Sequence, residues 1–124
     1  MAKLIRNLLQ RWSSRKGPWR VSDRVEQATD LPESIPAEHA LLVGTIVHPK
    51  WIAFECPCER GHRIMLNLDK TRRPFWRVTS EEPLSIRPSV DALYGKRRCH
   101  YVVSNGRVIW VHERQYRKES NDGR

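Results

Sequence analysis

Two cysteines separated by one residue, in Cys56-Pro57-Cys58, constrain the fold of this chain more than any other feature. The motif lies between two apolar runs typical of strands, and His62 stands four positions after the second cysteine. The third cysteine, Cys99, comes much later and is followed directly by His100. Thiolates and neutral imidazole are ligands that zinc prefers in proteins. The spacing therefore predicts a metal that joins two distant parts of a sheet.

The length and the charge narrow the class of protein. A chain of 124 residues forms one domain, small enough to benefit from a metal crosslink. Hydrophobic residues make up 39% and include five tryptophans, which argues against disorder. The net charge of +9 favours acidic partners, which include nucleic acid, an anionic membrane surface and an acidic protein.

The cysteine count and the hydropathy predict a cytoplasmic protein. Three cysteines cannot form a complete set of intramolecular disulfides, so thiols kept for a metal in a reducing compartment are the simpler interpretation. We see no signal peptide and no apolar stretch near the ~20 residues that a membrane span needs.

We divide the chain into three parts. Residues 1–18 predict a basic amphipathic helix, because Leu and Trp side chains recur at helical spacing and Gly17-Pro18 ends the pattern. Its apolar stripe either packs on the domain or docks on a partner or an anionic membrane surface. Residues 19–113 form a single zinc-binding, β-rich domain, and residues 114–124 form a charged, flexible tail.

The central part has the patterns of strands and turns. Asn105-Gly106 is the strongest hairpin signal, and residues 22–40 read as an extended connector lying over the domain. The expected strands are 19–21, 41–47, 51–55, 62–68, 75–79, 84–87, 101–104 and 107–112. The predicted fold class is α+β, mainly β: a small antiparallel, zinc-stabilised sheet domain with an N-terminal helix.

Five side chains are candidate metal ligands for a site that usually takes four. They are Cys56, Cys58, His62, Cys99 and His100. Four protein ligands would make the site structural, whereas three would leave a position for water and make it catalytic. The residues alone leave both alternatives open.

Ser89 and His100 form a second candidate site. A serine becomes a nucleophile only when a base such as histidine lies within hydrogen-bond reach. Ser89 follows one strand-like run and His100 precedes another, so neighbouring positions in a sheet would bring them together. The alternative is that Ser89, after a proline, is an ordinary turn residue. No third residue that would orient His100 is identifiable, and Asp91 is the nearest in sequence.

Cations and aromatic rings are interleaved in two segments, 70–77 and 96–101. Such a mixture can bind phosphates and stack bases. Rings in strands more often pack in a core. A non-enzymatic, zinc-ribbon-like module that binds nucleic acid or protein is therefore the alternative from a different functional class.

The order of several short motifs resembles a family of small bacterial proteins, the BubE-like family. The motifs are Phe54–Cys58, Leu66–Leu68, Arg73–Trp76, Pro88–Val90, His100-Tyr101 and Asn105–Trp110, and the resemblance runs from about residue 19 to residue 112. Members occur beside genes for bacterial ubiquitin-like conjugation. The resemblance implies a metal-containing peptidase that trims or removes a ubiquitin-like modifier, with a place in phage defence. It implies as partners a ubiquitin-like protein and its E1-like and E2-like enzymes.

The resemblance also implies roles for particular residues. The serine of the P-S-I/V motif and the histidine of the H-F/Y motif correspond to Ser89 and His100, a nucleophile and its base. Ser89 would attack the carbonyl after the modifier's C-terminal glycine.

This sequence departs from the family pattern at two cysteines. The family has C-P-C-G-C and a cysteine three residues before the motif histidine, and Arg60 and Arg97 occupy those positions here. His62 and Cys99 lie two residues further along, and positions i and i+2 of a strand share a face.

We therefore expect Cys56, Cys58, His62 and Cys99 to hold a structural Zn²⁺, which leaves His100 free as the base. If the strand geometry fails, His100 is the alternative fourth ligand. A zinc hydrolase would instead use metal-bound water with Glu55 or Glu59 as its base.

Overall fold

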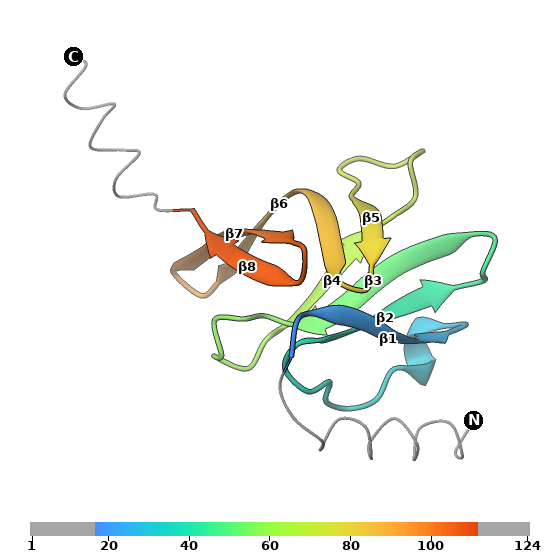
Figure 1. The fold of residues 1–124 in the computed structure, drawn as a ribbon, viewed down its shortest axis with the longest axis horizontal. Helices are drawn as coiled ribbons and strands as arrows, with labels where there is room; N and C mark the ends of the chain where they lie inside the picture. Colours follow the sequence, from blue (N-terminus) through green and yellow to red (C-terminus); the bar gives the residue numbers. More distant parts are fainter. Residues whose placement is uncertain (1–16, 112–124) are drawn as a thin grey trace.

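The computed structural model describes residues 17–111 as two four-stranded β-sheets (Figure 1). The first sheet has the strand order β1 (Arg20–Val25), β2 (His39–Gly44), β3 (Pro49–Glu55), β4 (Arg63–Asn67). The second has the order β5 (Arg77–Glu81), β6 (Leu84–Tyr94), β7 (Arg97–Ser104), β8 (Arg107–Trp110). Between residues 17 and 111 the one helical element is the short 3-10 helix η1 (Ala28–Asp30), so the prediction of a mainly β fold is confirmed.

The predicted N-terminal helix and C-terminal tail lie outside the described residues. In the part of the chain that the structure describes, no helix is long and apolar enough to cross a membrane.

The structure corrects the predicted antiparallel sheet in two respects. The strands divide between two sheets, and β1 pairs with β2 in parallel, from Arg20 opposite His39 to Val25 opposite Val43. A parallel pair needs a crossover of a dozen or more residues, and the segment 26–38 supplies it. The other pairings are antiparallel.

One hydrophobic core fills the space between the two sheets. Alternate side chains of each strand point into it because successive residues of a strand face opposite sides. The buried core residues are Trp19, Ala40, Leu42, Ile52, Phe54, Cys56, Ile64, Leu66, Leu84, Ile86, Val90, Cys99, Tyr101 and Val103. Two of the three cysteines are thus part of the core, at the junction between the sheets.

The crossover segment covers the opposite face of the first sheet. Ile35 is buried there against Leu41 and Ala53, with Leu31 packed beside them. The segment 26–38 therefore lies over the domain, as expected of the connector. The predicted bounds of the connector, 22–40, were too wide, because β1 continues to Val25 and β2 begins at His39. Burial on both faces explains why four consecutive residues, Ala40–Val43, are all buried.

Backbone hydrogen bonds join the two sheets near the β7–β8 turn. The amide of Trp19 donates to the carbonyl of Gly106 at 2.9 Å, and the amide of Leu84 donates to the carbonyl of Trp19 at 2.8 Å. Gly106 in turn donates to the carbonyl of Leu84 at 2.7 Å. The start of the first sheet is therefore fixed to the hairpin that carries β7.

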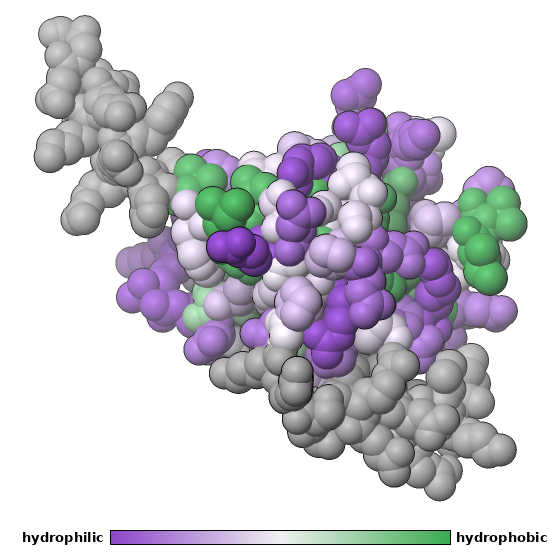
Figure 2. Space-filling model, viewed as in Figure 1, coloured by the Kyte–Doolittle hydropathy of each residue, from purple (hydrophilic) through white to green (hydrophobic). Residues whose placement is uncertain are grey.

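The surface in Figure 2 is largely hydrophilic, with a few separate hydrophobic patches. The most exposed large apolar side chains are Ile46 and Val47, at the turn between β2 and β3, and Leu93 near the end of β6.

Candidate functional site

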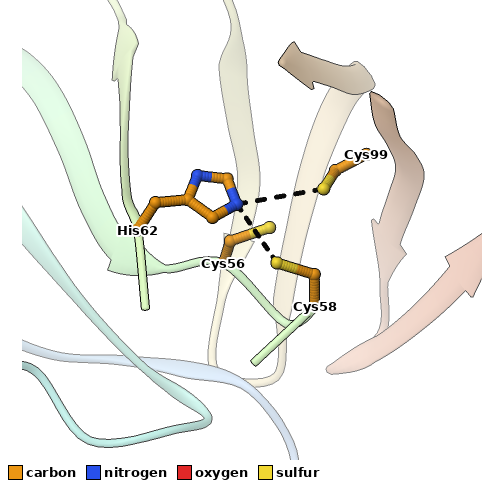
Figure 3. A group of neighbouring side chains, drawn as sticks. All are labelled: Cys56, Cys58, His62 and Cys99. Carbon is orange, nitrogen blue, oxygen red and sulfur yellow. Dashed lines mark hydrogen bonds between the residues drawn. The ribbon is translucent and has the colours of Figure 1, made fainter. Parts of the chain in front are cut away.

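Four of the five candidate metal ligands lie together where the two sheets meet (Figure 3). Cys56 and Cys58 follow β3, His62 precedes β4, and Cys99 comes from β7 of the other sheet. Their ligand atoms all lie within 4.8 Å of one another. A metal ion bound here would link the two sheets.

The β3–β4 turn folds so that both of its cysteines approach His62. The Cys56 amide donates to the carbonyl of His62 at 2.9 Å, and the Glu59 amide donates to the carbonyl of Cys56 at 3.1 Å. Gly61 has a φ of +86°, and a Cβ added there would meet nothing within 4 Å. Glycine is therefore favoured at this position because of the positive φ, since a side chain would have room.

The chemistry of these side chains fits a soft or borderline cation. The Nε2 atom of His62 lies 3.1 Å from Cys58 Sγ and 3.8 Å from Cys99 Sγ. The Tyr101 hydroxyl donates to Cys56 Sγ at 3.7 Å. Three sulfurs and one imidazole nitrogen form a donor set typical of zinc and related metals. The cluster could therefore hold a metal ion.

Burial alone disfavours the thiolate forms of Cys56 and Cys99. Desolvation raises the pKa of the Cys56 thiol to about 12, and burial also raises the pKa of the Cys99 thiol. Thiolates are the forms that bind metals, and a bound cation deprotonates its thiol ligands. Cys56 and Cys99 thus lie in an environment where their thiolate forms need a nearby cation.

His100 does not join this cluster. Its neighbour Cys99 is buried toward the core, and adjacent residues of a strand face opposite sides of a sheet. The Nε2 atom of His100 instead lies 3.0 Å from Ser89 Oγ. The two residues proposed as nucleophile and base are therefore within hydrogen-bond distance.

A bulge in β6 gives Ser89 this position. Ile86 pairs with Val103 and Val90 pairs with Tyr101, so three residues of β6 stand opposite one residue of β7. Proline is tolerated at such irregularities because it has no amide hydrogen to donate to the ladder. The Arg87 guanidinium fills the gap by donating to the carbonyls of Ile86 and Val103, at 2.8 and 3.1 Å. Ser89, expected to follow a strand, lies inside one.

Asp91 lies on the same outer face as Ser89 and His100. It stands directly opposite His100 in the β6–β7 register. Arg98 donates two hydrogen bonds to the Asp91 carboxylate, at 2.8 and 2.6 Å. These bonds, with smaller contributions from the charges of Arg98 and His100, lower the pKa of Asp91. A carboxylate that remains ionised therefore stands beside the histidine.

Trp76 supports Ser89 directly and Asn67 supports it through Trp76, roles that the sequence did not indicate. The Trp76 indole donates from Nε1 to the carbonyl of Ser89 at 3.0 Å. Trp76 is itself fixed by its amide, which donates to the carbonyl of Asn67 at 2.8 Å. The Asn67 side chain donates to carbonyls of the loop between them, those of Asp69, Arg72 and Pro74. Both residues belong to motifs quoted from the sequence, L-N-L and R-P-x-W. These motifs marked the two residues but did not indicate that they support Ser89.

Glu55, one of the two carboxylates considered as the base of a zinc hydrolase, is less suitably placed for that role. Glu55 accepts from Nε and Nη2 of Arg63, at 3.1 and 3.0 Å, and the same guanidinium also donates to the carbonyls of Pro32 and Glu33. Glu55 is therefore engaged in a structural ion pair.

One family model matches most of the part of the chain that the structure describes. A family model described as the bacterial ubiquitination-like system serine protease (BubE) matches residues 25–111. This range is well over half of the chain and contains both the metal cluster and the Ser89–His100 pair. Neither the curated proteins nor the solved structures gave a match.

Proposed function

The chain belongs to the BubE family of bacterial ubiquitination-like system serine proteases, and we propose that it is a peptidase that processes or removes a ubiquitin-like modifier. Ser89 is the nucleophile and His100 is the base. The observation that carries the proposal is the 3.0 Å distance between Ser89 Oγ and His100 Nε2. The partners are a ubiquitin-like protein and the E1-like and E2-like enzymes of its system.

The reaction that these two residues support is acyl transfer through the serine. Ser89 Oγ attacks the carbonyl carbon at the end of the modifier while His100 Nε2 takes the hydroxyl proton. His100 then gives this proton to the leaving amine, and the modifier remains bound to Ser89 as an ester. Water, deprotonated by His100, hydrolyses the ester and restores both residues.

Asp91 supports the base through its charge. His100 becomes a cation during each half of the reaction, and an ionised carboxylate on the neighbouring strand stabilises that cation. Arg98 keeps Asp91 ionised and fixes its position. Asp91 is therefore the carboxylate we assign to the support of His100.

Zinc has a structural role in this proposal. Cys56, Cys58, His62 and Cys99 would hold it, and it would supply a crosslink between the two sheets. The crosslink would stabilise β7, the strand that carries His100. These residues fix the geometry of the reactive pair without taking part in proton transfer.

The test is the intact mass of a ubiquitin-like protein of such a system, either extended at its C-terminus or joined to a lysine. It is incubated with the wild-type protein, with Ser89→Ala and with a control, Ser80→Ala, which changes a serine in β5 away from the pair. We expect cleavage at one site by the wild type and the control, and none by Ser89→Ala. Equal cleavage by Ser89→Ala would show that Ser89 is not the nucleophile.

A further inference from the structure

A basic pocket lies directly beside the proposed nucleophile. It has a volume of about 360 Å³ and is formed by the loop before β5, the start of β5 and the bulge of β6. Its lining residues are Arg73, Pro74, Phe75, Arg77, Arg87 and Pro88. The loop that forms its rim lies at the top of the molecule in Figure 1, where Figure 2 shows a hydrophilic surface.

Two of these arginines occupy directly opposed positions of neighbouring strands. Arg77 pairs with Arg87 in the β5–β6 register, and both are exposed. Like charges at directly opposed positions destabilise a sheet. Within residues 17–111 neither side chain forms an ion pair. The arrangement costs stability in the free protein and would be relieved by a bound anion.

Arg73, the third arginine of the lining, adds a further positive charge to the pocket. The Arg73 guanidinium carbon lies 6.0 Å from the centre of the Phe75 ring, and no acidic side chain of the described residues pairs with it. Arg87 donates only to neutral groups, the carbonyls of Ile86 and Val103 and the hydroxyl of Ser104. Three positive charges therefore surround the pocket without compensation.

The pocket is connected to Ser89 by the chain and by a hydrogen bond. Pro88, which lines it, immediately precedes Ser89. Trp76 lies between Phe75 and Arg77 of the pocket wall and donates to the carbonyl of Ser89. An extended peptide advances about 3.3 Å per residue. A substrate bound at Ser89 would therefore present a side chain near the scissile bond to these arginines.

We propose that this pocket is a substrate subsite that binds an acidic side chain within a few residues of the scissile bond. Arg73 and Arg77 hold the carboxylate, since the guanidinium fork matches a carboxylate's two oxygens. Arg87 adds positive charge to the pocket, while its hydrogen bonds to backbone carbonyls hold it at the β6 bulge. The inference rests on the proposed function only in naming the occupant as part of a peptidase substrate.

A library of capped decapeptides, randomised at every position over all amino acids except cysteine, tests this subsite by two separate readouts. Peptides retained by the Ser89→Ala protein report binding, and peptides cut by the protein with Ser89 intact report cleavage. Each readout is repeated with Arg73→Gln/Arg77→Gln and with the control Lys96→Gln/Arg97→Gln. The control removes the same charge from Lys96 in the β6–β7 turn and from Arg97 at the start of β7, and neither residue lines the pocket or is one of the four residues of the metal cluster.

We expect retained and cleaved peptides to be enriched in Asp or Glu at one position. The pocket variant should lose that enrichment about tenfold, while the control keeps it. The pocket variant should also unfold at a temperature no lower than the wild type, because it removes the opposed like charges. A loss of enrichment is then not explained by misfolding.

The remaining outcomes separate the two proposals. The subsite proposal is wrong if peptides are cleaved without a preference for Asp or Glu, or if both double variants lose the acidic enrichment equally. Either result leaves the peptidase proposal standing. Acidic enrichment in binding, with no cleavage of the library or of a ubiquitin-like protein, overturns the peptidase and supports the anion site. The protein is also tested with a thymidine 20-mer. If this oligonucleotide binds more tightly than any peptide, and only the pocket variant loses that binding, the pocket binds nucleic acid and the acidic-peptide proposal is wrong.

Discussion

Cys99 and His100 are consecutive residues of β7, yet they belong to opposite faces of the second sheet. Cys99 is buried at the junction of the sheets, with Sγ 3.8 Å from His62 Nε2. His100 is half-buried on the outer face, with Nε2 3.0 Å from Ser89 Oγ. The alternation of a strand thus places one residue in the metal cluster and the next beside Ser89. His100 can therefore be changed without removing a residue of the metal cluster.

Substitution at these two positions should separate metal binding from catalysis. Cys99→Ser removes a buried ligand, so we expect loss of the metal and a thermal midpoint lower by roughly 10 °C or more. His100→Gln should keep the metal and change stability by about 1 kcal/mol or less, while cleavage is lost. Elemental analysis and thermal denaturation measure these effects. If His100→Gln also loses the metal, His100 is a ligand and the serine mechanism is wrong.

Removal of the metal should unfold the whole domain. The cluster takes three ligands from one sheet and one from the other, so the metal's binding free energy contributes to their association. We expect excess chelator to abolish the folded circular dichroism spectrum, and added zinc to restore it. A protein that stays folded under chelation but no longer cleaves its substrate would indicate a catalytic metal.

The sequence predicted the parts of this fold that depend on local rules. The side chains predicted as ligands, Cys56, Cys58, His62 and Cys99, lie together, and their binding of a metal stays a prediction. Strand parity accounts for Cys99, which shares β7 with Arg97, but not for His62, because residues 60–62 lie in the turn between β3 and β4, where Gly61 has a positive φ. The Asn105-Gly106 hairpin followed from turn chemistry, and both residues have positive φ values, 52° and 77°. These features depend on neighbours along the chain.

The features that were missed depend on long-range pairing. The end predicted for a strand at Arg87 was wrong because a bulge accommodates Pro88 and lets β6 continue to Tyr94. The parallel pairing of β1 and β2 depends on where a crossover returns the chain. The support of Ser89 by Trp76 depends on a loop organised by Asn67. No local pattern encodes these relationships.

Two glycines with similar backbone angles should differ in their tolerance of alanine. Gly106 has φ +77°, and a Cβ there would lie 2.6 Å from Pro18 Cβ and 3.2 Å from the Trp19 carbonyl oxygen. Gly95 has φ +63° and an open surrounding. We expect Gly95→Ala to cost about 1 kcal/mol and Gly106→Ala about 2–4 kcal/mol in the free energy of unfolding. Urea denaturation measures both, and equal costs would mean that Gly106 does not hold the sheets together.

Trp76→Phe should reduce cleavage more than it reduces stability. The substitution keeps a ring in the half-buried site but removes the Nε1 donor to the Ser89 carbonyl. A lost neutral hydrogen bond is worth about 1 kcal/mol, so we expect kcat/KM to fall roughly fivefold and the thermal midpoint to change by only a few degrees. Trp51→Phe, which changes a half-buried ring of β3, is the matched control. If both variants lose the same activity, the bulge of β6 positions Ser89 without help from Trp76.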